Sequence, residues 1–140
     1  MTMTKNYQEL IPGRVYIGGA DDLSVALENE KIDVAYDLRA EAGESLFENH
    51  KHTPIVDDAA NQDESIRHAV SEIVHSYNEG KNIYFHCQGG SNRTGTVAIG
   101  TLLSLELAKS MDDAELQAKS ARPKINVKPE MKEALARLYK

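Results

Sequence analysis

Short apolar runs alternate with longer segments of helical periodicity along this chain. Four of these runs have the length of strands and are rich in β-branched or aromatic residues, at 14–19, 32–38, 52–57 and 82–86. Pro54 weakens the third run, because proline cannot donate a backbone hydrogen bond to a neighbouring strand. The pattern therefore predicts four strands, of which the third is the weakest.

Helical spacing is clearest between residues 63 and 80, where apolar side chains gather on one face before the segment stops at Gly80: Ile66, Ala69, Val70, Ile73, Val74 and Tyr77. Two further helices are predicted at 21–30, which begins with acids, and at 93–108, which is apolar enough to be mostly buried. The chain closes with predicted helices at 110–121, capped by Ser110 or Asp112, and at 129–140, where Pro129 is a first helical residue.

Strands and helices that interleave in this order predict an α/β fold. We expect three layers, with a central, mostly parallel sheet of four or five strands and helices on both of its faces. The 140 residues contain no internal repeat, low-complexity tract or linker-like segment, so we expect a single domain over residues 1–140.

Composition narrows the classes of partner. The chain has 16 Lys and Arg against 22 Asp and Glu, a net charge of −6, which argues against nucleic acid or an anionic membrane as a partner. Its single cysteine cannot form an internal disulfide, and its start has no apolar run as long as a signal peptide or membrane span. We therefore expect a cytoplasmic protein in a reducing compartment, not attached to a membrane and monomeric by default.

That cysteine lies in the stretch HCQGGSNRTGT, residues 86–96, which joins the predicted strand at 82–86 to the buried helix after it. A strand that runs through a glycine-rich turn into a helix points free backbone N–H groups and the positive end of the helix dipole at one place. Gly89 and Gly90 allow the backbone to approach an anion closely, and Arg93 can grip two of its oxygens. The stretch therefore predicts a site for a phosphate-sized anion.

Cys87 lies at the mouth of this predicted anion site. A thiol beside a helix N-terminus and an arginine has a lowered pKa and is largely thiolate near neutral pH. Thr94 can donate a hydrogen bond to the thiolate and stabilise it as a leaving group. The residues thus predict phosphoryl transfer onto sulfur, with backbone N–H groups and Arg93 holding the charge of the transferred group in place of a metal.

The stretch HCQGGSNRTG matches the signature H-C-x-x-G-x-x-R-[ST]-G of the Cys-dependent protein tyrosine phosphatases at every fixed position. The rest of the chain resembles the small dual-specificity branch of that superfamily. The resemblance covers nearly the whole chain, through the segments RVYIGGADD, IDVAYDLRAE, HTPIVDD and MDDAELQAKSARPKINVKPEM.

This resemblance implies a role for each matching residue. Cys87 matches the nucleophile, Arg93 the phosphate-binding arginine, Thr94 the hydroxyl that helps the thiolate leave, and His86 the residue that organises the loop and supports the low thiol pKa. The backbone from residue 88 to residue 93 matches the phosphate cradle of the family, which consists of Gln88, Gly89, Gly90, Ser91, Asn92 and Arg93.

The resemblance also implies a general acid upstream. Asp57 stands three residues after Pro54 and thirty before Cys87, as the family pattern requires, and Asp58 is its rival. Such an acid protonates the leaving oxygen in the first step and activates water in the second. A solvated acidic loop is the alternative reading of the same residues.

No metal or other cofactor is expected. The histidine pairs His68 with His75 and His50 with His52 have no Cys or carboxylate set that would complete a metal site.

These observations favour a metal-independent phosphomonoester hydrolase of the dual-specificity or tyrosine phosphatase type. It would act on a phosphorylated protein or a small phosphomonoester through a cysteinyl-phosphate intermediate. The alternatives are a phosphate-binding pseudo-phosphatase, a relative of RNA 5′-triphosphatases or small-molecule phosphatases, and a rhodanese or arsenate reductase relative. Ser91 stands where inositol-lipid phosphatases often have a basic residue, which argues against an inositol lipid as the substrate.

Overall fold

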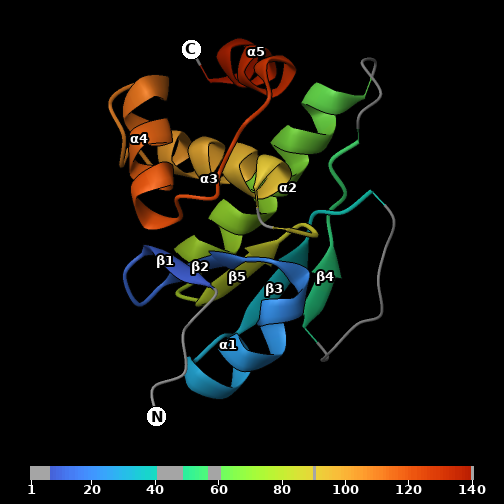
Figure 1. Cartoon of the computed structure of the whole chain (residues 1–140), viewed down its shortest axis with the longest axis vertical. Coiled ribbons are helices and arrows are strands. Elements are labelled where there is room, and N and C mark those ends of the chain that lie inside the picture. The colour runs from blue at the N-terminus through green and yellow to red at the C-terminus, as the bar shows by residue number, and fades with distance from the viewer. Residues whose placement is uncertain (1–6, 41–48, 57–60, 90, 140) are drawn as a thin grey trace.

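The computed structural model of this protein describes residues 7–40, 49–56, 61–89 and 91–139. Its strands form one sheet in the order β1-β2-β5-β3-β4 (Figure 1). Their bounds are β1 Gln8–Ile11, β2 Val15–Gly18, β3 Val34–Asp37, β4 His50–His52 and β5 Ile83–His86. Strands β2, β5, β3 and β4 pair in parallel, and β1 pairs antiparallel with β2 at one edge. The predicted mostly parallel sheet is confirmed.

Helices cover both faces of this sheet (Figure 1). The 3-10 turn η1 (Ala20–Asp22) and α1 (Leu23–Asn29) lie on one face. On the other face are α2 (Gln62–Asn78), α3 (Asn92–Ser104) and α4 (Met111–Ala121), and α5 (Pro129–Leu138) packs against α2 and α3. The three-layer α/β architecture is confirmed.

The central strand β5 shows why the predicted strands are apolar throughout. Ile83 and Phe85 point into the larger core, which α2 and α3 complete, whereas Tyr84 points into the smaller core under α1. Successive strand residues face opposite sides of a sheet, so a sheet covered on both faces needs an unbroken apolar run.

The structure differs most from the predicted elements at three places. Strand β1 was not predicted; it forms a hairpin with β2 through Gly13, whose φ is +74°. Strand β4 is His50–His52, not 52–57, although the amide of Thr53 still donates to Asp37 in β3 and that of Ile55 to Leu38 just after it. The amide position of Pro54 faces the open edge of the sheet, where a missing N–H is tolerated. Helix α3 ends at Ser104, two residues before Glu106 takes a φ of +59°.

The last two helices begin at the predicted signals. The Ser110 hydroxyl accepts a hydrogen bond from the amide of Asp113 at 3.1 Å and caps α4, and Pro129 opens α5. Within the described parts of the chain, no helix is both long and apolar enough to cross a membrane.

Replacing Gly95 with alanine should lower the free energy of unfolding. A Cβ at this position in α3 would lie 2.6 Å from Cγ2 of Ile125 and 2.8 Å from Cγ2 of Val127. Such overpacking costs about 1–3 kcal/mol, of which the better helix propensity of alanine returns up to about 1 kcal/mol. Urea unfolding measures the difference. Ser104→Ala, at an exposed position of the same helix, is the control and should stay within about 0.5 kcal/mol of the wild type.

Candidate active site

The loop that follows β5 lies where the carboxyl ends of three parallel strands meet. The last residue of β5, His86, is in register with Gly18 of β2 on one side and with Asp37 of β3 on the other. Cys87 comes next, and α3 begins five residues later at Asn92. Open α/β sheets bind ligands at this edge. The fold therefore puts the predicted nucleophile at the usual ligand-binding end of the sheet.

Cys87 and Thr94 are directly hydrogen-bonded to each other. The Thr94 hydroxyl accepts from the Cys87 amide at 3.0 Å and donates to the Cys87 Sγ at 3.1 Å. Thr94 is fully buried and Cys87 is 7% exposed. Because the hydroxyl oxygen already accepts from the amide, its single proton is free to point at the sulfur. This contact is the one that the predicted role of Thr94, stabilising negative charge on the sulfur, requires.

A hollow of about 210 Å³ opens above Cys87. Its wall brings together the described residues of the predicted cradle with the nucleophile and one residue from the start of α5: Cys87, Gln88, Gly89, Ser91, Asn92, Arg93 and Lys128. Gly90, the remaining cradle position, lies outside the described residues. A hollow of this kind, at a helix N-terminus and beside an arginine, suits an oxyanion such as phosphate.

The first turn of α3 is not capped by its own N-cap side chain. Ser91 occupies the N-cap position, but its hydroxyl donates to the carbonyl of Lys124 at 3.0 Å and makes no cap hydrogen bond. Helix amides that lack a capping side chain can instead bind an anion, which the helix dipole also favours. The N-terminus of α3 thus adds to the positive potential of the hollow.

Backbone carbonyls of the loop are held by neighbouring elements. The Gln88 carbonyl accepts from the amide of Ala20 at 3.1 Å, and the Gly89 carbonyl accepts from Nη2 of Arg122 at 3.1 Å. Arg122 is 2% exposed, and its Nη1 donates to Oε1 of Gln8 in β1 at 2.6 Å. These contacts anchor the loop to η1 and β1. The sequence analysis did not single out Arg122, because a buried arginine has no local signature.

Lys128 is a second cation at the hollow that the sequence analysis did not select. Its amide donates to Oδ1 of Asn92 at 2.9 Å, which ties the start of α5 to the start of α3. The contact joins residues 36 positions apart in the chain. No spacing rule could have placed this residue on the wall of the same hollow as Arg93.

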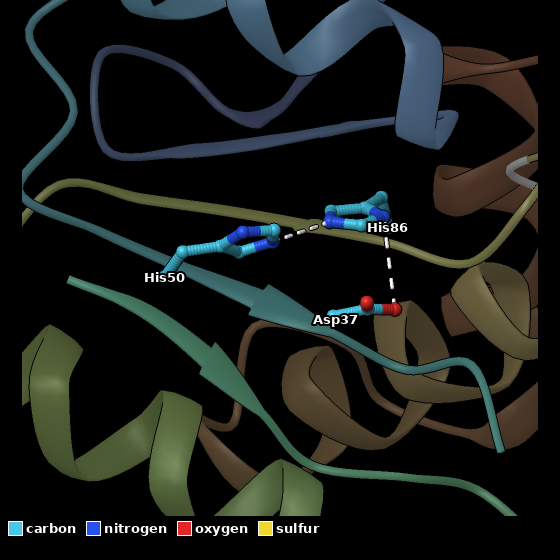
Figure 2. Close-up of side chains that lie close together, drawn as sticks. All are labelled: Asp37, His50 and His86. Carbon is cyan, nitrogen blue, oxygen red and sulfur yellow. Dashed lines mark hydrogen bonds and ion pairs between the residues drawn. The ribbon is translucent and has the colours of Figure 1, made fainter. Parts of the chain in front are cut away.

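His86 lies behind the nucleophile and is 1% exposed. Its Nδ1 donates to the carbonyl of Cys87 at 3.0 Å and lies 4.0 Å from Oδ1 of Asp37. Its Nε2 is 3.0 Å from Nε2 of His50, so the three side chains form one cluster (Figure 2). Burial lowers the pKa of His86 more than the Cys87 carbonyl and Asp37 raise it. The imidazole is therefore neutral near pH 7.

Asp37 is held by Arg39, which follows β3. The Arg39 Nε donates to Oδ1 at 2.9 Å and its Nη2 donates to Oδ2 at 2.7 Å. Burial alone would raise the pKa of Asp37, but the hydrogen bonds from the Arg39 side chain and amide outweigh it and lower the pKa to about 2. Arg39 also donates to Oε1 of Gln88 at 3.1 Å, so this charged pair supports the loop as well.

Among the described residues, Asp37, His50 and His86 are the one group of three possible metal ligands, with ligand atoms within 4.8 Å of one another. Both oxygens of Asp37 already accept from Arg39, and Nδ1 of His86 donates to the Cys87 carbonyl. The Nε2 atoms of His50 and His86 share a hydrogen bond with each other. The arrangement fits a hydrogen-bonded cluster better than a metal site.

Asp57 and its rival Asp58 lie outside the described residues, so both stay predictions from the sequence. The chain is described up to Val56, whose amide donates to the Ser65 hydroxyl of α2 at 3.2 Å.

Residues 15–140 match the family model "Dual specificity phosphatase, catalytic domain". Human DUSP28 is similar in structure, with a TM-score of 0.82 at 15% identity over 98% of this chain and 95% of that one. Tk-PTP in the active form has a TM-score of 0.77 at 24% identity over 98% of each chain. A comparison with curated protein sequences gave no match. The protein belongs to the dual specificity phosphatase family.

Proposed function

We propose that this phosphatase is a metal-independent phosphomonoester hydrolase that works through a cysteinyl-phosphate intermediate. The observation that carries the proposal is the contact of 3.1 Å from the Thr94 hydroxyl to the Cys87 Sγ, at the base of a hollow lined by Arg93. A pure phosphate-binding protein would need neither a thiol there nor a hydroxyl directed at it.

In the first step, the Cys87 thiolate attacks the phosphorus atom of a substrate whose phosphate lies in the hollow. The S–P bond forms as the bond from phosphorus to the leaving oxygen breaks. Arg93, the cradle amides and the N-terminus of α3 stabilise the charge on the transferred group. Asp57 donates a proton to the leaving oxygen, so the product departs as an alcohol or phenol.

In the second step, water replaces the sulfur. Asp57, now a carboxylate, removes a proton from a water molecule that attacks the phosphorus of the intermediate. The S–P bond breaks and returns both of its electrons to sulfur. Thr94 then donates its hydrogen bond to the regenerated thiolate, and inorganic phosphate leaves the hollow.

The proposed substrates are phosphorylated proteins or small phosphomonoesters. The family name and the similarity to DUSP28 and Tk-PTP support phosphotyrosine together with phosphoserine or phosphothreonine as the chemical class. Lys128, on the wall of the same hollow, adds positive charge beside Arg93 and so also favours an anionic substrate.

Hydrolysis of p-nitrophenyl phosphate in the presence of a chelator tests the proposal. Turnover should continue at an unchanged rate after EDTA treatment, because all the groups that stabilise charge belong to the protein. Binding of phosphate without any turnover would support the pseudo-phosphatase instead. Turnover that EDTA removes and a divalent cation restores would contradict the metal-independent mechanism.

The general acid can be identified from how strongly the loss of kcat in a variant depends on the leaving group of the substrate. Asp57→Asn should lower kcat by about 10²–10⁴-fold with phenyl phosphate, whose leaving oxygen needs a proton, and by less with p-nitrophenyl phosphate. The decline of kcat at high pH, where the acid is deprotonated, should also disappear. Asp58→Asn is the matched control and should leave both features in place. The reverse result would move the role to Asp58.

A further inference from the structure

The contact between His50 and His86 is not used by the mechanism above. Their Nε2 atoms are 3.0 Å apart (Figure 2). His50 belongs to β4, at the edge of the sheet, and is half-buried, whereas His86 is 1% exposed and is adjacent to the nucleophile. A ring from the edge strand is therefore hydrogen-bonded to the buried ring behind Cys87.

The hydrogen-bond partners decide where the protons of the two rings lie. The Cys87 carbonyl can only accept, so the His86 Nδ1 that lies 3.0 Å from it carries a hydrogen. The other nitrogen of a neutral ring then has only a lone pair. The Nε2 of His50 must therefore be the donor, which makes His50 the Nε2–H tautomer.

This chain of bonds ends at the first peptide group of the cradle. In a trans peptide the C=O and the following N–H point in opposite directions, and the described chain contains no cis peptide bond. With the Cys87 carbonyl held toward the His86 ring, the N–H of Gln88 points away from that ring. Gln88 lines the hollow, so an N–H directed away from the His86 ring can meet a bound oxyanion or the thiolate there.

The charged and titratable groups around the two rings support the neutral state that this pattern needs. Burial is the largest influence and lowers the pKa of both rings; Asp37 on β3 opposes it, and Arg39 acts with it. His52, on the same strand as His50, lowers the pKa of His50 further. The Tyr84 ring on β5 lies 5.9 Å from His86, and burial raises its pKa, so it is uncharged as well.

We propose that His50 is a positioning residue: its Nε2–H holds His86 in the Nδ1–H tautomer, so that His86 orients the Cys87–Gln88 peptide and its N–H toward the reacting sulfur. This role rests on the proposed function, since it concerns the thiolate of the same nucleophile. Without the donor, His86 can carry its hydrogen on Nε2 instead. Nδ1 then stops donating to the Cys87 carbonyl, and the thiolate loses a directed N–H group.

The pH dependence of Cys87 alkylation by iodoacetamide tests this role without requiring turnover. In His50→Phe the thiol pKa should rise by about one unit, so alkylation well below the wild-type pKa should slow about tenfold. Nitrogen NMR shifts of His86 should change from the Nδ1–H form to a mixture of both tautomers. His50→Gln, whose amide reaches the position of the imidazole Nε2–H, should restore the alkylation rate to within about twofold.

His50→Asn is the matched partner of His50→Gln, because its amide donor is one carbon shorter and does not reach His86. His50→Asn should behave like His50→Phe. If His50→Phe does not fold, the comparison of His50→Asn with His50→Gln therefore still tests the role. His75→Phe, at a histidine whose side chain is 72% exposed on α2, should change neither readout.

The role would be overturned if His50→Asn left both the pKa of the Cys87 thiol and the His86 tautomer unchanged. It would also be overturned if His50→Gln and His50→Asn slowed the alkylation of Cys87 equally. A wild-type thiol that titrates near its ordinary pKa of about 8.5 would be a different result, since it contradicts the activated nucleophile of the proposed function itself.

Discussion

Replacing Cys87 with serine is expected to reduce the hydrolysis of p-nitrophenyl phosphate by at least about 10⁴-fold, as for other enzymes that lose their nucleophile. A serine hydroxyl is not ionised near neutral pH, and the Thr94 hydroxyl, which donates to the side chain at this position, cannot remove its proton. Initial rates of phosphate release, compared with those of the wild type at the same substrate concentration, measure the loss.

The Cys87→Ser protein also provides its own control. Sulfur and oxygen differ little in size, so the fold and the hollow should remain, and inorganic phosphate should still raise the temperature of unfolding. A variant that keeps its phosphate response and loses turnover separates binding from chemistry. Residual activity above about 1% of the wild type would mean that the phosphoryl group does not pass through sulfur.

The second large effect is expected at Arg93. Arg93→Lys keeps the positive charge but loses the planar pair of donors that grips two oxygens at once. Loss of such a donor typically costs about 10²–10³-fold, and we expect that loss in kcat/KM. Phosphate at one hundred times its dissociation constant should stabilise the wild type by about 2.7 kcal/mol, and the variant by much less at that concentration.

Arg67→Lys is the control for this substitution. Arg67 lies on α2, its side chain is 61% exposed, and it pairs with Glu64 away from the hollow. Its replacement should leave kcat/KM and the phosphate response unchanged. An Arg93→Lys protein with nearly normal kcat/KM would show that charge alone is sufficient and that the fork geometry of the arginine is not used.

Much of the fold could be predicted because its strands and helices carry their signals locally. The apolar run of β5, the glycine-rich turn and the apolar helix α3 are contiguous, so the sequence predicts their order and the site between them. Strand β1 has no such signal: its segment QELI is short, lies at an edge and is stabilised by pairing with β2. Strand β1 forms because it pairs with β2 in a hairpin, and the pattern of apolar and polar residues in its own segment does not reveal that pairing.

The candidate site likewise has one part that the sequence predicts and another that only the structure shows. Cys87, Thr94 and the cradle lie within eight consecutive residues, and their contacts follow from that spacing. His50, Arg122 and Lys128 reach the same place from distant segments, and only the sheet register and helix packing bring them there. His50 was set aside as a metal ligand from the sequence, and the structure shows it hydrogen-bonded to His86 instead.

The bridge from Gln8 through Arg122 to Gly89 links the edge strand to the loop that follows the predicted nucleophile, although β1 contains no predicted catalytic residue. A fragment that began at β2 would retain every predicted catalytic residue. Its buried Arg122 would nevertheless lose the Gln8 acceptor, and with it part of what anchors the loop above the nucleophile. We therefore expect a fully stable phosphatase fragment to include Gln8, outside the segment that carries the chemistry.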